Sequence, residues 1–313
     1  MNVIMNIIKK IFERTEIVFF VALLAALLIP VNMSAWKLSI EIALGVVMFF
    51  SIRPFFRHEF NVHKNIKHVI TSIVFNYVLL SAVYLIAAWF IIGTQNEYFI
   101  GYVLIAIVPP AISIIPLCYL TQCDAESADA AIFVSYAIAI ILIPLALFII
   151  FKKSFDFLIL IKIILILIII PMLAAWASAK SKNNLFNYTK SITNSCLGFI
   201  IFISIEINRH IFLDFNNPTL VRIYLIDFIA IFVLGAIVYT LSRMSTSHNE
   251  AINYSLYASQ KNVGTAITLA IVLFHEYAAV PAIIALILQY IYFILLEKVL
   301  IPLHINSGEQ KNT

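Results

Sequence analysis

The sequence predicts an all-α polytopic membrane protein with about ten transmembrane helices. Hydrophobic residues make up 63% of the 313 residues and charged residues only 12%, whereas soluble domains carry about 25% charged residues. Apolar runs of about 20 residues, the length needed to cross a bilayer, recur along the whole chain. Lipid offers no hydrogen bonds to the backbone, so these runs are expected to be helical despite their many β-branched residues.

The apolar runs define ten expected spans, at 16–33, 38–56, 66–92, 98–121, 126–151, 155–178, 191–212, 221–242, 249–275 and 278–300. The segment 1–15 alternates apolar and basic side chains, which is typical of a helix lying at the membrane surface. Residues 304–313 form a short polar tail.

The basic residues predict the orientation. With a cytoplasmic N-terminus, 13 of the 20 Lys and Arg residues fall on the cytoplasmic side, 5 fall on the other side, and Lys162 and Lys261 lie within spans. This asymmetry predicts a multi-pass protein of the inner (plasma) membrane with both termini in the cytoplasm. The net charge of +4 is spread over these short loops and gives no case for binding nucleic acid.

The spans divide into two repeats of five helices, 16–151 and 155–303, and each repeat contains one interrupted span. An odd number of helices per repeat inverts the second repeat relative to the first. This arrangement is typical of secondary transporters, whose sites lie between broken helices.

The first interruption lies in span 98–121, where Pro109, Pro110 and Pro116 fall within eight residues. Each proline removes a backbone donor and clashes with the preceding turn, so one regular helix is not expected. A kinked packing helix is the alternative. Ser113, between these prolines, is a candidate site hydroxyl.

The second interruption lies in span 249–275 and concentrates polar groups at mid-span. A lysine at this depth costs roughly 3 kcal/mol, so Lys261 is expected to have a partner or a function. We take Asp129, near the start of the following span 126–151 of the first repeat, as the preferred partner. The alternative is that the segment is a loop. The candidate site residues of this span are Tyr257, Ser259, Gln260, Lys261, Asn262 and Thr265, with Gly264 at the break.

Both segments resemble the bile acid/sodium symporter superfamily, including its bacterial members. The matching residues are Ser259-Gln260-Lys261-Asn262-Val263-Gly264-Thr265-Ala266, Pro109-Pro110-Ala111, Tyr119-Leu120, Pro144 and Asn76, which falls where the family has a site-facing glutamine. The resemblance implies a core domain of spans 3–5 and 8–10 with two crossing broken helices. It also implies a panel domain of spans 1, 2, 6 and 7, and a substrate crevice between the two domains.

The family's sodium ligands are replaced in this chain. Their positions correspond to Ile114, Ile115, Ala128, Ile132, Tyr257 and Lys261, which lack the oxygen ligands that sodium prefers and add a positive charge. The sequence therefore predicts a transporter of a small organic anion that works by alternating access and is proton-coupled or uncoupled. Lys261 would exchange protons with a nearby carboxylate or hold the anionic substrate.

Other functions receive less support. A receptor or scaffold built on a transporter fold would also explain the lost sodium ligands, and auxin-carrier-like transport stays open. Arsenite export is disfavoured, because that branch's cysteine falls at Pro110. The spaced histidines His58, His63 and His68 are interpreted as part of a solvated loop, so we predict no enzyme activity, no metal site and no cofactor. A disulfide framework is not expected, because Cys118, Cys123 and Cys196 lie in or beside apolar segments.

Overall fold

A computed structural model describes residues 12–31, 36–56, 63–121, 123–150, 165–214 and 216–302. Every regular element in these ranges is helical, as the sequence predicts. Most of the predicted segment 1–15, all of 304–313 and the first part of span 155–178 lie outside the described residues. Within the described residues, five helices are long and apolar enough to cross a membrane: Ile66–Ile91, Ala125–Ile150, Leu185–Ile207, Pro218–Arg243 and Glu276–Leu300.

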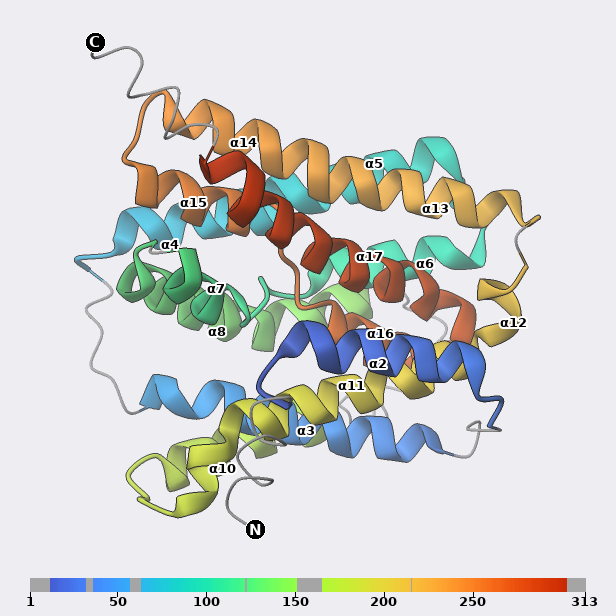
Figure 1. The fold of residues 1–313 in the computed structure, drawn as a ribbon, viewed down its shortest axis with the longest axis horizontal. Helices are drawn as coiled ribbons and strands as arrows, with labels where there is room; N and C mark the ends of the chain where they lie inside the picture. The colour runs from blue at the N-terminus through green and yellow to red at the C-terminus, as the bar shows by residue number, and fades with distance from the viewer. Residues whose placement is uncertain are drawn as a thin grey trace.

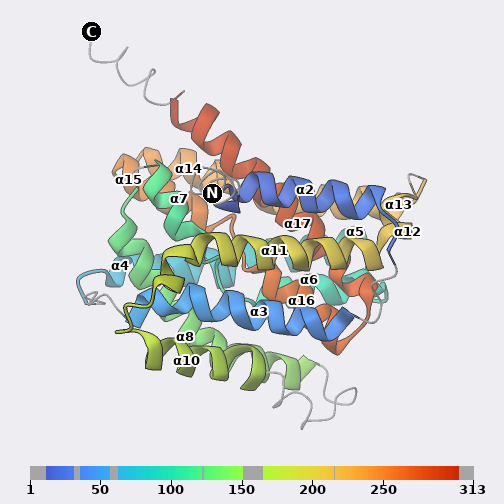
Figure 2. The ribbon, with the colours of Figure 1, turned by 60° about the horizontal axis from the view of Figure 1, so that its bottom comes forward.

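One group of helices forms the lower part of the molecule in Figure 1. In it, α11 (Thr189–Ile207) packs against α2 (Thr15–Leu28) and α3 (Lys37–Ile52), and α3 packs against α10 (Ile170–Ser178). Figure 2 shows α11, α3 and α10 running side by side. The short elements of this group are η2 (Arg53–Phe56), η4 (Leu165–Ile169), η5 (Asn184–Tyr188) and α12 (Arg209–Phe212).

A second group is built from long helices that contain π-helical turns. Its unbroken members are α4 (Ile66–Ser72), η3 (Ile73–Leu80) and α5 (Ser81–Ile91); α8 (Ala125–Ile150); α13 (Pro218–Phe228), η6 (Ile229–Val233) and α14 (Leu234–Arg243); and α17 (Glu276–Leu295) with η7 (Leu296–Leu300). Two thirds of the apolar window of α17 is buried, more than in any of the other four long helices. This helix therefore forms the centre of the group.

Two of the predicted spans are each broken into two helices. The first consists of α6 (Glu97–Ile107) and α7 (Ile114–Thr121), and the second of α15 (His248–Tyr257) and α16 (Val263–Leu273). The breaks therefore cover residues 108–113 and 258–262. Both are shorter than the interruptions that the sequence predicted, which included Pro116 and Gly264. Pro116 and Gly264 lie in the first turns of α7 and α16, where a missing N–H or a missing side chain does not end a helix.

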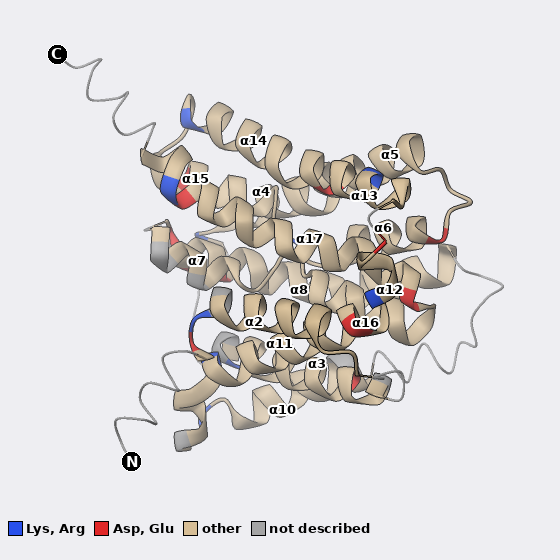
Figure 3. Cartoon of the chain, turned by 45° about the vertical axis from the view of Figure 1, so that its right-hand side comes forward, with Lys and Arg blue, Asp and Glu red and all other residues tan. Residues whose placement is uncertain are grey.

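The outer surface of the bundle suits a lipid environment. Large apolar side chains such as Phe90, Leu28 and Ile141 expose more than two thirds of their surface. Charged residues gather near the two ends of the bundle, and uncharged residues cover most of its middle (Figure 3). Such an apolar band between polar ends is typical of a protein that crosses a bilayer.

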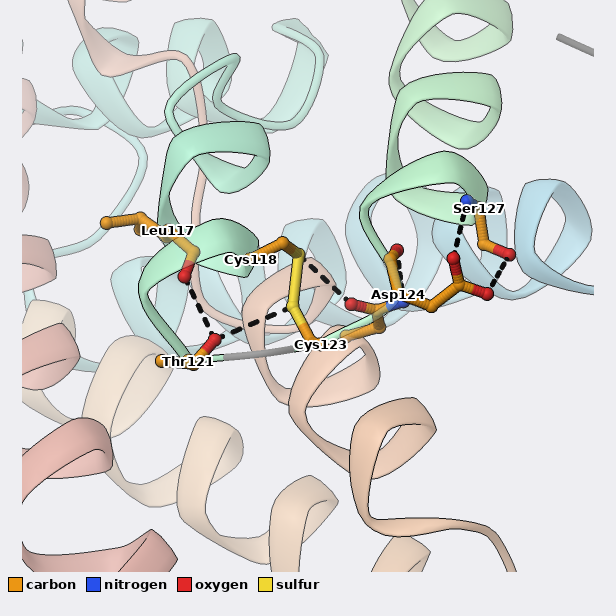
Figure 4. Close-up of a disulfide and its surroundings, with 7 residues drawn as sticks. Leu117, Cys118, Thr121, Cys123, Asp124 and Ser127 are labelled. Atoms are coloured by element: carbon orange, nitrogen blue, oxygen red, sulfur yellow. Dashed lines mark hydrogen bonds between the residues drawn. A yellow bond between two sulfur atoms is a disulfide. The ribbon is translucent and has the colours of Figure 1, made fainter.

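A disulfide links the last turn of α7 to the connection before α8, which corrects the sequence expectation. Cys118 and Cys123 are joined, with their Cα atoms 4.7 Å apart (Figure 4). The apolar segments around the two cysteines do not prevent this bond, because a tight turn brings Cys118 and Cys123 together. Asp124 then caps α8 by accepting from the Ser127 amide (3.1 Å) and hydroxyl (2.6 Å). Burial opposes ionisation of Asp124, but these hydrogen bonds outweigh it and lower the pKa of the carboxyl.

The packing of α6 on α17 depends on a glycine. A Cβ atom added at Gly101 would clash with the Ala278 carbonyl and would lie 3.0 Å from Pro281. At Gly45, in the interior of α3, the nearest atom would be 3.9 Å away. Of these two glycines, Gly101 is therefore the one that close helix packing requires.

We predict opposite effects of alanine at these two glycines. Gly101→Ala should destabilise the protein by about 1–3 kcal/mol, because overpacking separates α6 from α17. Gly45→Ala should be neutral or stabilising, since alanine favours a helix by about 1 kcal/mol. Thermal unfolding of the purified variants in one detergent measures both. Equal unfolding temperatures for the two variants would contradict this account of the packing.

Candidate substrate and coupling site

The two breaks meet each other inside the bundle. Pro110 and Lys261 pair as one antiparallel β-bridge, in which the Ala111 amide donates to the Gln260 carbonyl (3.1 Å) and the Asn262 amide donates to the Pro109 carbonyl (2.8 Å). The prediction that the two breaks lie together is confirmed. Each unwound backbone thus satisfies part of the other's hydrogen-bonding capacity, which lipid cannot do.

The prolines determine which carbonyls the first break leaves free. In a continuous helix the amide of residue 110 would donate to the carbonyl of Ala106, but a proline has no N–H. The Ala106 carbonyl receives the ammonium of Lys261 instead, at 2.9 Å, and the Val108 carbonyl receives it at 3.0 Å. Lys261 therefore caps the negative C-terminal end of α6.

The hydrogen bonds around Lys261 match a charged ammonium group. Its third contact is the Ser81 hydroxyl at 3.0 Å. That hydroxyl has one proton, which it gives to the Ala106 carbonyl (2.7 Å) or the Asn76 carbonyl (3.1 Å), so its oxygen accepts from lysine. Three acceptors then use all three donors of an ammonium group. The side chain is 1% exposed, and the Tyr77 ring lies 4.9 Å from Nζ.

Asn76 performs the corresponding task at the second break. Its amide nitrogen donates to the carbonyl of Tyr257 (2.9 Å), the last residue of α15, and to the carbonyl of Gln260 (3.0 Å) in the break. Both negative helix ends at the crossing are therefore bound by a side chain from elsewhere in the bundle.

The central helix α17 supports the backbone of Lys261 through Gln289. The Gln289 amide pairs with this backbone when its nitrogen faces the Lys261 carbonyl (3.1 Å) and its oxygen faces the Lys261 amide (3.0 Å). The Gln260 side chain donates to the Gln289 carbonyl at 3.1 Å. The backbone of Lys261 is therefore held by side-chain contacts, as its ammonium group is.

Asn262 connects the start of α16 to α8. Its side-chain oxygen caps α16 by accepting from the Thr265 amide (3.3 Å), and its nitrogen donates to the Tyr136 hydroxyl (2.7 Å). The backbone of Ile112, in the first break, also interacts with the Tyr136 hydroxyl. Tyr136 therefore binds the second break directly and lies near the first.

The remaining predicted residues have different surroundings. Ser259 donates to the Ser255 carbonyl (2.7 Å), and Ser113 is half-buried beside the first break. The hydroxyls of Tyr257 and Thr265 are buried without a hydrogen-bond partner in the described part of the chain. The structure does not bring Asp129 to the Lys261 ammonium. The three hydrogen bonds of that ammonium go to Ser81, Ala106 and Val108, and Asp129 is half-buried on α8.

Sequence reasoning missed four residues of the crossing: Tyr77, Ser81, Tyr136 and Gln289. A signal existed for Ser81 and Gln289, since each is a polar residue inside an apolar span. The tyrosines carried no such signal, because tyrosine is common among buried aromatic residues of any helix bundle.

We predict that Lys261→Met destabilises the protein. Methionine has a similar length but leaves the carbonyls of Ala106 and Val108 without their lysine donor, at a cost of about 1–3 kcal/mol for each unsatisfied group. Thermal unfolding in detergent measures the change. Lys298→Met is the control, because that side chain is 68% exposed and should change stability by about 0.5 kcal/mol or less. Equal stability of the two variants would refute the capping role.

Comparison with known proteins agrees with this geometry. No individual curated protein matches the chain. The model of the SBF-like CPA transporter family matches residues 13–303, a range that includes both broken helices and their crossing. This match confirms the resemblance to bile acid/sodium symporter-like proteins that the two motifs predict. The chain belongs to the SBF-like CPA transporter family.

Proposed function

We propose that this membrane transporter moves a small organic anion by alternating access and does not use sodium for coupling. The observation that carries the proposal is the Lys261 ammonium group at the crossing of the broken helices, bound to three oxygens at 2.9–3.0 Å. A positive charge fixed among backbone carbonyls provides the electrostatic stabilisation that a bound cation would otherwise give.

The surroundings of the crossing disfavour a sodium site. Hard cations bind oxygen ligands, yet Ile114, Ala128 and Ile132 are buried at three of the positions that the resemblance assigns to sodium ligands. The carbonyls of Ala106 and Val108 are free of helix bonds but already accept from Lys261. A sodium ion there would compete with an ammonium group for the same oxygens and would be repelled by it.

The same crossing suits an anion. The helices α7 and α16 both begin at the breaks, so their positive ends and first amides face this region. The buried Thr265 hydroxyl, in the first turn of α16, lacks a partner in the described residues and is available as a donor. A carboxylate is the chemical group that these features favour.

The packing supports a motion between two bodies. The crossing is tied together by hydrogen bonds from α5, η3, α8 and α17, so we propose that it moves as one core. The other group of helices, α2, α3, α10 and α11, packs against α16 through apolar contacts. One example is Leu197 of α11, which would lie 3.5 Å from a Cβ atom added at Gly264. The proposed protein has ten spans in two inverted repeats. The group α2, α3, α10 and α11 is its panel, and both termini are cytoplasmic.

Uptake into proteoliposomes tests the function. The full chain is reconstituted and given a panel of labelled mono- and dicarboxylates with an imposed sodium gradient, an imposed proton gradient, or neither. We expect uptake of at least one anion, and no stimulation by sodium. Lys261→Gln should reduce this uptake at least about tenfold, which corresponds to a loss of about 1.4 kcal/mol. Lys298→Gln, at an exposed lysine, is the matched control.

Three results would count against the proposal. Stimulation by a sodium gradient alone would refute the coupling argument. Unchanged uptake by Lys261→Gln would remove the crossing as the site. Binding of an anion without any uptake would favour a receptor built on a transporter fold. Asp129→Asn tests the remaining predicted carboxylate, and we expect a smaller effect than that of Lys261→Gln.

A further inference from the structure

A second buried ionisable group lies apart from Lys261. Asp227 belongs to α13, inside the long helix Pro218–Arg243, and its side chain is 0% exposed. Neither carboxyl oxygen has a hydrogen-bond partner of good geometry in the described part of the chain. Buried polar groups almost always have partners, so a carboxyl with two open oxygens at membrane depth requires an explanation.

The titratable neighbours of Asp227 are tyrosines from three helices. Tyr84 on α5, Tyr102 on α6 and Tyr224 on its own helix all interact with the carboxyl. The rings of Tyr84 and Tyr102 lie 5.9 Å apart. Within the described ranges, no lysine or arginine is among the groups that interact with this carboxyl.

These surroundings favour a neutral carboxyl group. An unpaired carboxylate at bilayer depth is costly, and carboxyl groups there usually pair or carry protons. The Tyr102 hydroxyl donates its only proton to the Ile223 carbonyl, 3.2 Å away. Its oxygen can therefore accept from a protonated Asp227, whereas a carboxylate would need the Tyr102 proton to turn away from Ile223.

The tyrosines also connect this carboxyl to the crossing. Tyr102 precedes Ala106 by about one helical turn, and Tyr84 follows Ser81 by nearly the same distance, roughly 5 Å along each helix. Ala106 and Ser81 are the groups that bind the Lys261 ammonium. The tyrosines that interact with Asp227 therefore lie about one helical turn from the residues that bind the Lys261 ammonium.

We propose that Asp227 is a proton-binding site, and that the proton it carries is the one coupled to transport. The inference rests on the proposed function and selects its proton-coupled form. The carboxyl takes a proton from water on one side of the membrane and returns it to water on the other, so no further reactant is needed. When the proton leaves, the Tyr102 hydroxyl turns from the Ile223 carbonyl to the carboxylate. This change in the hydrogen bond of Tyr102 alters the packing of α6 one helical turn from Ala106, which binds Lys261.

Infrared difference spectroscopy of the full chain in lipid bilayers tests the site without any substrate. Spectra are recorded as the buffer is changed from acidic to alkaline. The wild type should show the C=O stretch of a neutral buried carboxyl, which disappears as the pH rises. Asp227→Asn should lack this band. Glu206→Gln, which alters a carboxyl on α11 that accepts from the Val31 amide in the connection after α2, should retain it.

A variant that keeps the carboxyl covers the case in which Asp227→Asn does not fold. Asp227→Glu should retain a titrating band at a changed frequency, because the longer side chain meets different neighbours. A band of the same amplitude and frequency in the wild type, Asp227→Asn and Asp227→Glu would overturn the proposal.

Transport measurements then separate this inference from the proposed function. For an anion that the wild type takes up, Asp227→Asn should retain exchange of labelled for unlabelled anion but lose acceleration by a proton gradient. Continued acceleration would overturn the role of Asp227 and leave anion transport intact. If the wild type transports no anion, the proposed function fails, while the infrared result still decides whether Asp227 binds a proton.

Discussion

The structure depends on one constraint: backbone groups released by two broken helices must find partners where there is no water. Pro110 removes the amide that would have bonded to the Ala106 carbonyl, and Lys261 from the other break supplies a replacement. Asn76 does the same for the end of α15. The costs of breaking both helices are thus offset by the same few contacts, so the two breaks stabilise each other and neither is expected to persist alone.

This mutual dependence explains why a lysine is tolerated at the centre of the bundle. A buried ammonium group is costly unless its charge and its donors are matched. At the crossing the charge meets the negative end of α6, and all three donors meet oxygens. The matching needs no carboxylate, which is why Asp129 is not required beside Lys261. The proposed loss of sodium coupling follows from the same contacts, because the oxygens that would attract a cation are occupied.

Much of this arrangement could be predicted from the sequence, because it follows from chemistry that acts locally. The adjacent prolines Pro109 and Pro110 cannot continue a helix, because neither has an N–H to donate to the preceding turn, and a lysine inside an apolar run indicates a special environment. The partner of Lys261 could not be predicted in this way. A search for opposite charges selects Asp129, whereas the true acceptors are backbone carbonyls that every residue carries and that only the crossing brings together. The Cys118–Cys123 disulfide was missed for a related reason, since the tight turn between the helices is a property of the fold.

The two buried ionisable groups differ in how completely their hydrogen-bonding capacity is satisfied, and this difference gives them different roles. Lys261 uses every donor it has, so a change in its protonation would break contacts that hold both breaks together. Neither oxygen of Asp227 has a hydrogen-bond partner of good geometry among the described residues, and the single proton of its neighbour Tyr102 has two possible acceptors. Asp227 can therefore gain or lose a proton while the fold around it stays intact. A proton-coupled transporter needs one group that gains and loses a proton in each cycle and a surrounding structure that stays folded while it does. The contacts of Lys261 make it part of the stable structure at the crossing, and those of Asp227 make it the group that can change its protonation.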